Sequence, residues 1–221
     1  LRVTAIACDR PMKPVADVYG DYETIFRRQL EFAAAYLTKA GTPCGVIVEP
    51  FDARIGRLPT PADGHFDLFL LSGSKASAFA DLPWIHALKQ WLRDADHVFP
   101  RTAVMGICFG LQVLTEAFGG RVARHENGWE IGTIEITLNA DAAAVFTRRA
   151  VRAGDVVQLQ SIHEDHVVRV PDRFVNLGAT PHSPVQMMAS RDGRFFCTQS
   201  HPEFTSDMID IMIKVRRGDA I

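Results

Sequence analysis

The sequence lacks a marked excess of charge and any long apolar run. Its 24 lysines and arginines nearly balance 26 aspartates and glutamates, which gives a net charge of −2 at pH 7. This balance indicates neither a nucleic-acid partner nor a membrane partner. The sequence contains no signal-peptide pattern and no apolar stretch of about eighteen residues, the length that indicates a membrane-spanning helix. We therefore expect a protein of the reducing cytoplasm.

Cysteine is scarce, and its positions are scattered. Cys8, Cys44, Cys108 and Cys197 have neither metal-ligand spacing nor the density of a disulfide scaffold. Residues 163–166 place two histidines three positions apart with acids between them. This pattern could be a metal cluster, but we interpret it as a polar loop at the rim of a site. We expect no bound metal and no cofactor.

No linker-like stretch, internal repeat or low-complexity tract divides the chain, so residues 1–221 are expected to form a single domain. Apolar runs predict strands at residues 2–7, 44–48, 66–71 and 102–107, and helical periodicity predicts helices at 21–40 and from 81 onward. Later segments at 131–138, 156–159 and 185–188 alternate as antiparallel strands do. The expected fold is a three-layer α/β domain, with a mostly parallel sheet flanked by helices and extra antiparallel strands in the C-terminal half.

The sequence Gly106-Ile107-Cys108-Phe109-Gly110 lies between the apolar run at 102–105 and a stretch with helical periodicity at 111–118. A strand, a Gly-x-Cys-x-Gly turn and a helix form a nucleophile elbow, here with sulfur in place of a hydroxyl. The glycines matter because a Cβ beside the strained turn would clash with the strand or the helix. The turn also places the sulfur at a helix N-terminus, where the dipole favours thiolate. The alternative is a buried structural cysteine beside two packing glycines.

A second motif, Gln199-Ser200-His201-Pro202-Glu203, follows a strand-like run at residues 194–198. A cysteine nucleophile needs a base to take its proton, and that base needs a third group to orient it. His201 and Glu203 can supply these roles, because the intervening proline forces an extended or turn-like backbone on which residues two apart can face the same way. On its own, the motif could be a surface turn.

Together, the two motifs resemble the Gly-x-Cys-x-Gly-x-Gln and His-Pro-Glu motifs of the class I glutamine amidotransferase family. Leu71-Ser72-Gly73-Ser74 is similar to that family's loop before the nucleophile, and Trp129-Glu130-Ile131-Gly132 resembles a segment near its bound glutamine. Residues 161–167 resemble a further family segment. The resemblance implies a triad of Cys108, His201 and Glu203 that attacks a γ-glutamyl amide.

The resemblance also implies roles for other residues. The amides of Phe109 and of the loop at Gly73 and Ser74 would form the oxyanion hole. Gln112 lies one helical turn after Cys108 and would contact the glutamine moiety, although it could instead be a polar surface residue. Trp129 and Glu130 would also bind substrate. We interpret two arginine pairs, Arg27-Arg28 and Arg216-Arg217, as solvated helix faces.

The loop departs from the usual pattern, because Ser74 and Lys75 stand where synthetase-linked members commonly have Gly-Pro. This loop and residues 18–22 resemble stand-alone amidotransferase-like proteins such as plant γ-glutamyl peptidases, and we expect no synthetase domain after Ile221. Three interpretations therefore compete: a stand-alone hydrolase of γ-glutamyl amides or peptides, a glutaminase subunit that hands ammonia to a separate synthetase in trans, and a binding or regulatory module without turnover. The intact triad argues against the third, and we favour the hydrolase.

Overall fold

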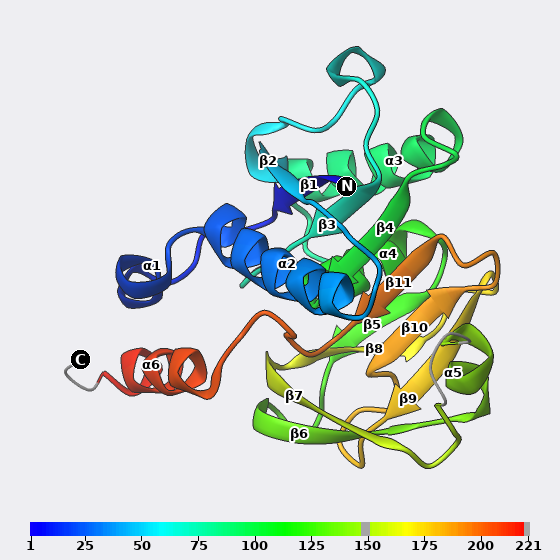
Figure 1. The fold of residues 1–221 in the computed structure, drawn as a ribbon. Helices are drawn as coiled ribbons and strands as arrows, with labels where there is room; N and C mark the ends of the chain where they lie inside the picture. Colours follow the sequence, from blue (N-terminus) through cyan, green and yellow to red (C-terminus); the bar gives the residue numbers. More distant parts are fainter. Residues whose placement is uncertain (147–150, 219–221) are drawn as a thin grey trace.

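The computed structural model describes residues 1–146 and 151–218. Within them, nine strands form one mixed sheet in the order β2-β1-β3-β4-β11-β10-β9-β6-β7, and β5 pairs with β8 separately (Figure 1). The strands are β1 (Arg2–Ala7), β2 (Ile47–Asp52), β3 (Leu68–Leu71), β4 (Ala103–Ile107), β5 (Arg121–Arg124), β6 (Glu130–Leu138), β7 (Val156–His163), β8 (Asp165–Arg169), β9 (Phe174–Ala179), β10 (Met187–Ser190) and β11 (Phe195–Thr198).

Helices cover both faces of the parallel half of the sheet, where β2, β1, β3, β4 and β11 run side by side (Figure 1). The α-helices are α1 (Lys13–Tyr19), α2 (Tyr22–Lys39), α3 (Pro83–Val98), α4 (Phe109–Ala117), α5 (Ala140–Val145) and α6 (Ser206–Arg217). Apolar residues of α3 and α4 share one buried core, and those of α2 and α6 share another. The predicted three-layer α/β fold is confirmed.

The C-terminal half of the sheet is antiparallel, as the alternating pattern predicted. Strands β10, β9, β6 and β7 continue the sheet beyond β11 with antiparallel pairing at each step. Helix α5 packs against β9 and helps to bury Ile136 and Leu177. The end of β7 in this half contributes Ile162 and His163 to the cavity that contains Cys108.

Several predicted strands have different bounds; that expected at 156–159, for example, extends to His163. The strand expected at 44–48 begins only at Ile47 and continues through Pro50 to Asp52. Proline is tolerated there because β2 is the edge strand of the sheet, so the missing N–H costs no ladder bond on the outer side. The strand expected at 185–188 runs instead from Met187 to Ser190. In the described part of the chain, no helix is long and apolar enough to cross a membrane.

The strand register brings the two sequence motifs to one edge. Leu71 of β3 pairs with Gly106 of β4, and Thr198 of β11 pairs with Ile107 of β4. Because these strands are parallel, the residues that follow each of them emerge at the same carboxyl edge. The amide of Cys108 donates a hydrogen bond of 2.8 Å to the carbonyl oxygen of Thr198, which ties the two strand ends together.

Candidate active site

Cys108 occupies a strained turn between β4 and α4. Its backbone angles are φ 54° and ψ −106°, and it is the only non-glycine residue with positive φ in the described residues. Such a conformation persists only where the surrounding structure enforces it. A Cβ on Gly106 would lie 2.6 Å from the carbonyl of Gly110, and one on Gly110 would lie 2.8 Å from the carbonyl oxygen of Leu71. The two glycines therefore allow strand and helix to approach as the turn requires.

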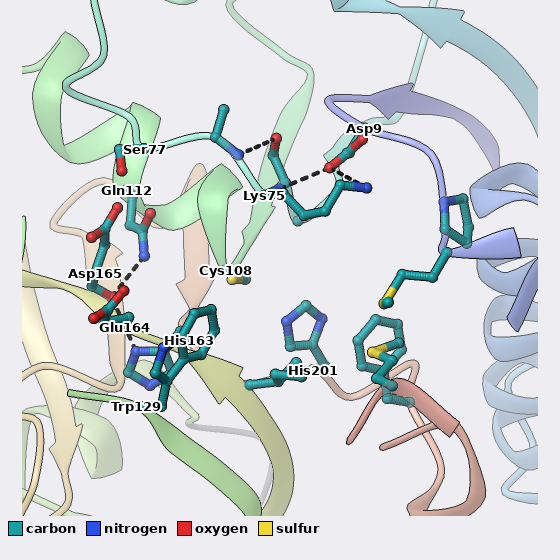
Figure 2. A pocket seen from close by; sticks show the side chains of 18 of the residues that line it. Asp9, Lys75, Ser77, Cys108, Gln112, Trp129, His163, Glu164, Asp165 and His201 are labelled. Atoms are coloured by element: carbon teal, nitrogen blue, oxygen red, sulfur yellow. Dashed lines mark hydrogen bonds and ion pairs between the residues drawn. The ribbon is translucent and has the colours of Figure 1, made fainter. Parts of the chain in front are cut away.

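His201 and Glu203 form a buried pair beside this turn. The Nδ1 atom of His201 lies 2.8 Å from Oε1 of Glu203, and the imidazole stacks on Phe204 with ring centroids 4.1 Å apart. Its other nitrogen, Nε2, has no hydrogen-bond partner among the described residues. His201 and Cys108 line the same cavity, where Figure 2 places them close together. The carboxylate and the stacked ring thus fix the imidazole, and Nε2 remains available for proton transfer.

The local electrostatics favour a protonated His201. Burial disfavours the imidazolium, but the charges of Glu203 and Cys108 outweigh it and raise the pKa of His201 to about 10. At neutral pH the ring therefore carries a proton and can stabilise a thiolate on Cys108. The N-terminus of α4 points at the same sulfur and favours negative charge there.

Gly73 lies close to both His201 and Cys108. A Cβ on Gly73 would lie 2.9 Å from Cε1 of His201 and 3.5 Å from the Cβ of Cys108. The hydroxyl of Ser72 donates to the carbonyl of Gly73 and accepts from the amide of Cys8, both at 2.9 Å. Ser72 thereby fastens the loop to the end of β1 and holds Gly73 against the nucleophile.

Hydrogen bonds within the loop after β3 limit which backbone amides can donate to an oxyanion. The amide of Lys75 already donates to Asp9 at 2.8 Å, and the Lys75 ammonium lies 3.1 Å from the same carboxylate. Within the described residues, the amides of Gly73 and Ser74 donate to no side chain. Phe109 is in the first turn of α4, where an N–H has no acceptor within the helix. The arrangement is thus compatible with the donors expected from the sequence.

Gln112 is buried and lines the cavity, so it is not a surface residue. Its Nε2 donates to the carbonyl of Asp165 at 2.9 Å and to Oε1 of Gln199 at 3.1 Å. With its nitrogen held by the protein, Gln112 has its side-chain oxygen left for a ligand. Trp129 also lines the cavity, and 43% of its surface is exposed at the rim.

Glu130 is placed differently from the sequence expectation. It does not line the cavity, and its carboxylate accepts hydrogen bonds from His163, Thr180 and Gln186. Burial opposes ionisation, but the bonds from His163 and Thr180 hold the pKa of Glu130 below its ordinary value. These partners hold the carboxylate in place, and the role of Glu130 in binding substrate stays a prediction. Glu130 orients His163, which does line the cavity.

A family model for class I glutamine amidotransferases matches residues 31–213, which include both motifs and the loop between β3 and α3. The chain belongs to this family. A glutamine amidotransferase-like protein of Schizosaccharomyces pombe is 27% identical over 99% of this chain and 86% of its own length. Gamma-glutamyl peptidase 3 of Arabidopsis thaliana is 32% identical over 70% of this chain, which spans 61% of the peptidase's length.

A solved glutamine amidotransferase from Thermotoga maritima has the same fold as this amidotransferase-like chain. The two superpose with a TM-score of 0.70 over 99% of this chain and 83% of the other, at 20% sequence identity. At that identity the likeness concerns the fold alone.

Sequence reasoning missed several residues that line the cavity of this amidotransferase-like chain. Arg216 of α6 is exposed, as expected of a solvated helix face, but its guanidinium also lies over the Trp129 ring at the cavity, 4.2 Å from the centroid. Arg10 and Tyr22 also line the cavity. No motif indicated Arg10, and the resemblance of residues 18–22 to stand-alone family members assigned no site role to Tyr22. Residues 163–166 lie at the junction of β7 and β8 rather than in a loop. Among the described residues, no group of three or more potential ligand side chains could hold a metal ion.

Proposed function

We propose that this chain is a stand-alone hydrolase that cleaves a γ-glutamyl amide or peptide bond through a thioester on Cys108 and releases glutamate. The observation that supports this most is that Cys108 and His201 line one cavity, while the buried Glu203 fixes the imidazole through Nδ1 and Nε2 has no partner among the described residues. The kinship with γ-glutamyl peptidases, at modest identity, is consistent with a γ-glutamyl substrate.

The reaction begins with attack of the Cys108 thiolate on the γ-carbonyl carbon. The carbonyl π electrons move to oxygen, and the amides of Phe109 and of Gly73 or Ser74 stabilise the oxyanion. Loss of one such donor typically costs about 2.7–4 kcal/mol of transition-state stabilisation. The oxyanion then collapses, the carbon–nitrogen bond breaks, and the proton on Nε2 of His201 passes to the departing nitrogen. The product of this half-reaction is a γ-glutamyl thioester.

Water completes the cycle. Neutral His201 now takes a proton from a water molecule as its oxygen attacks the thioester carbon. Collapse of the second oxyanion breaks the carbon–sulfur bond, releases glutamate and restores the thiolate–imidazolium pair. Glu203 keeps Nδ1 oriented and stabilises the charged ring in both halves. Gln112 and Trp129 border the space on the glutamyl side of the nucleophile.

The alternative is a glutaminase subunit that passes ammonia to a separate synthetase in trans. The relative from Schizosaccharomyces pombe favours it, because a protein named amidotransferase-like matches almost the whole chain. Both candidates use the same triad, so the residues of the triad cannot separate them.

Glutamate release from the purified chain tests the proposal. The chain alone is incubated with glutamine and with a γ-glutamyl peptide such as glutathione, and the Cys108→Ala variant serves as the control. We expect the chain to cleave the peptide with a higher kcat/KM than glutamine, and Cys108→Ala to release none. A chain that ignores the peptide but hydrolyses glutamine once a synthetase is added would instead be an amidotransferase subunit.

A further inference from the structure

A buried histidine–carboxylate pair at the wall of the cavity has no part in the chemistry proposed above. Glu130, at the start of β6, is the antiparallel partner of His163, at the end of β7. Nε2 of His163 lies 2.9 Å from Oε2 of Glu130, and only 3% of His163 is exposed. His163 lines the cavity, and Figure 2 places it on the same side of the nucleophile as Gln112 and Asp165. A role for the pair is therefore expected among those neighbours.

Both ring nitrogens of His163 face groups that accept hydrogen bonds. Nδ1 lies 3.0 Å from the backbone carbonyl oxygen of Asp165, which can only accept. The side chain of Glu130 also accepts from the Thr180 hydroxyl at one oxygen and from Gln186 at the other. Burial opposes its ionisation, but the hydrogen bonds from His163 and Thr180 hold the pKa of Glu130 below its ordinary value, so it accepts as a carboxylate. The ring therefore donates from Nδ1 as well as from Nε2.

The carbonyl of Asp165 connects His163 to Gln112. Its oxygen accepts from Nδ1 of His163 and, at 2.9 Å, from Nε2 of Gln112. A carbonyl oxygen has two lone pairs, and these two donors occupy both. Because this oxygen cannot donate, it determines that the nitrogen of the Gln112 amide faces the protein and that its oxygen is left for a ligand. Gln199 accepts from the same nitrogen at 3.1 Å, which supports the same orientation.

We propose that His163 and Glu130 are positioning residues that orient Gln112 toward the glutamyl group. Glu130 orients the imidazole, the imidazole holds the carbonyl of Asp165 in place, and that carbonyl orients the amide of Gln112. Among the described residues, no hydrogen bond joins the pair to the triad, so it acts on ligand binding and not on the sulfur. Loss of an interaction of this kind raises KM and leaves kcat nearly unchanged. The inference rests on the proposed function for the identity of the ligand.

Two substitutions of His163 separate its two donors. The side-chain nitrogen of asparagine is as many bonds from Cβ as Nδ1 is, and that of glutamine is as many as Nε2 is. His163→Asn therefore keeps a donor for the carbonyl of Asp165, whereas His163→Gln keeps one for Glu130 alone. We expect His163→Gln to raise KM for glutathione and for glutamine about tenfold, as the loss of one buried hydrogen bond would, and to change kcat by less than about twofold. His163→Asn should raise KM by less than about threefold.

A double variant tests whether the effect passes through Gln112. Gln112→Ala removes the side chain that the pair orients, so adding His163→Gln to it should raise KM by less than about twofold further. Additive increases in KM would show that His163 acts by another route and would overturn the inference. His86→Gln, at an exposed position on α3, is the matched control and should leave KM unchanged.

Hydrogen exchange separates failure of this inference from failure of the proposed function. NMR measures the exchange of the side-chain amide protons of Gln112, which are assigned by their absence in Gln112→Ala. Exchange should be slow in the unaltered chain and in His163→Asn, and at least about tenfold faster in His163→Gln. This pattern supports the inference even if the chain hydrolyses no γ-glutamyl substrate.

Equal exchange rates in the two His163 variants would overturn the inference, as would equal KM values in an active chain. If His163→Gln does not fold, His163→Asn alone decides the matter. Slow exchange of the Gln112 amide protons in this variant supports the inference, and fast exchange or a tenfold higher KM overturns it.

Discussion

Cys108 differs from the other cysteines in its surroundings. It lines a cavity, lies at the N-terminus of α4 and faces a protonated imidazole, whereas Cys8 and Cys197 are buried in the core. Burial raises the pKa of Cys8 and raises that of Cys197 to about 12. Cys44 is partly exposed and has neither a helix N-terminus nor an imidazole beside it.

We therefore expect brief iodoacetamide treatment at neutral pH to alkylate Cys108 first. Peptide mass mapping gives the labelling rate of each of the four thiols. The rate at Cys108 should fall in His201→Ala, because the stabilising imidazolium is gone. Equal labelling of all four cysteines would contradict the role assigned to the turn.

The different roles of His201 and Glu203 predict that substituting them lowers kcat to different extents. His201→Ala should lower kcat by roughly 10⁶-fold, because both proton transfers pass through this ring. Glu203→Gln keeps a partner on Nδ1 but removes the carboxylate charge that raises the pKa of His201. The decrease in kcat for Glu203→Gln should be smaller than for His201→Ala, although still at least about a hundredfold. Rates of glutamate release measure both, and a fully active Glu203→Gln would exclude Glu203 from the triad.

At the residue scale, the sequence predicted the candidates whose roles depend on local geometry. Cys108 and the pair of His201 and Glu203 each lie in a short motif that fixes backbone shape. The contact of Arg216 with Trp129 and the buried partners of Glu130 were not predicted, because they come from distant strands and helices. Residue periodicity reports which face of a helix is apolar, but it does not report that Arg216 would reach Trp129 on another element.

At the scale of elements, the junction of β4 and α4 depends on close approach. A Cβ on Gly106 would meet the carbonyl of Gly110 at 2.6 Å, so either the strand or the helix would have to move. Gly106→Ala should therefore lower the free energy of unfolding by about 1–3 kcal/mol, as overpacked sites do. Chemical denaturation measures the change. Gly45→Ala is the matched control, since no atom lies within 4 Å of its added Cβ; similar losses in both variants would refute the packing argument.

The sequence predicted the order of elements better than their ends. The apolar patterns at 21–40 and 102–107 agree with α2 and β4. A helix buried on one face and a strand buried on both faces each leave a clear pattern of apolar residues in the sequence. The start of β2 was misjudged because an edge strand is half solvated and can contain Pro50. Helix α1 was not predicted, since its seven residues are too few to establish a helical period.

At the scale of the whole molecule, a stack of histidines links stability to pH. The ring of His125 lies 4.3 Å from that of His166 and 4.0 Å from that of His182, centroid to centroid. Burial, together with the neighbouring His125, His163 and His182, lowers the pKa of His166, against the opposing charge of Asp165. The unfolded chain therefore binds more protons than the folded chain just below pH 6.5, the ordinary value for this group. Stability falls as pH falls through that window.

His166→Gln should reduce this acid sensitivity. The decrease in Tm between about pH 7.5 and about pH 5.5 should be smaller by a few degrees than in the unaltered chain. Calorimetry at the two pH values measures it. His86→Gln, at an exposed position on α3, is the control and should leave the decrease unchanged. An equal decrease in all three proteins would show that carboxylates alone cause the acid sensitivity.

The pairing of β11 with β4 has a consequence for how the molecule folds. Phe195 pairs with Val104, so the two strands that hold the nucleophile and its base meet only when a long intervening loop closes. The entropy cost of such closure rises slowly with length, but distant pairings of this kind form late in folding. During synthesis, Cys108 therefore leaves the ribosome well before its imidazole does. A chain still missing β11 carries the thiol without the group that activates it, so reactivity arises only when the sheet is complete.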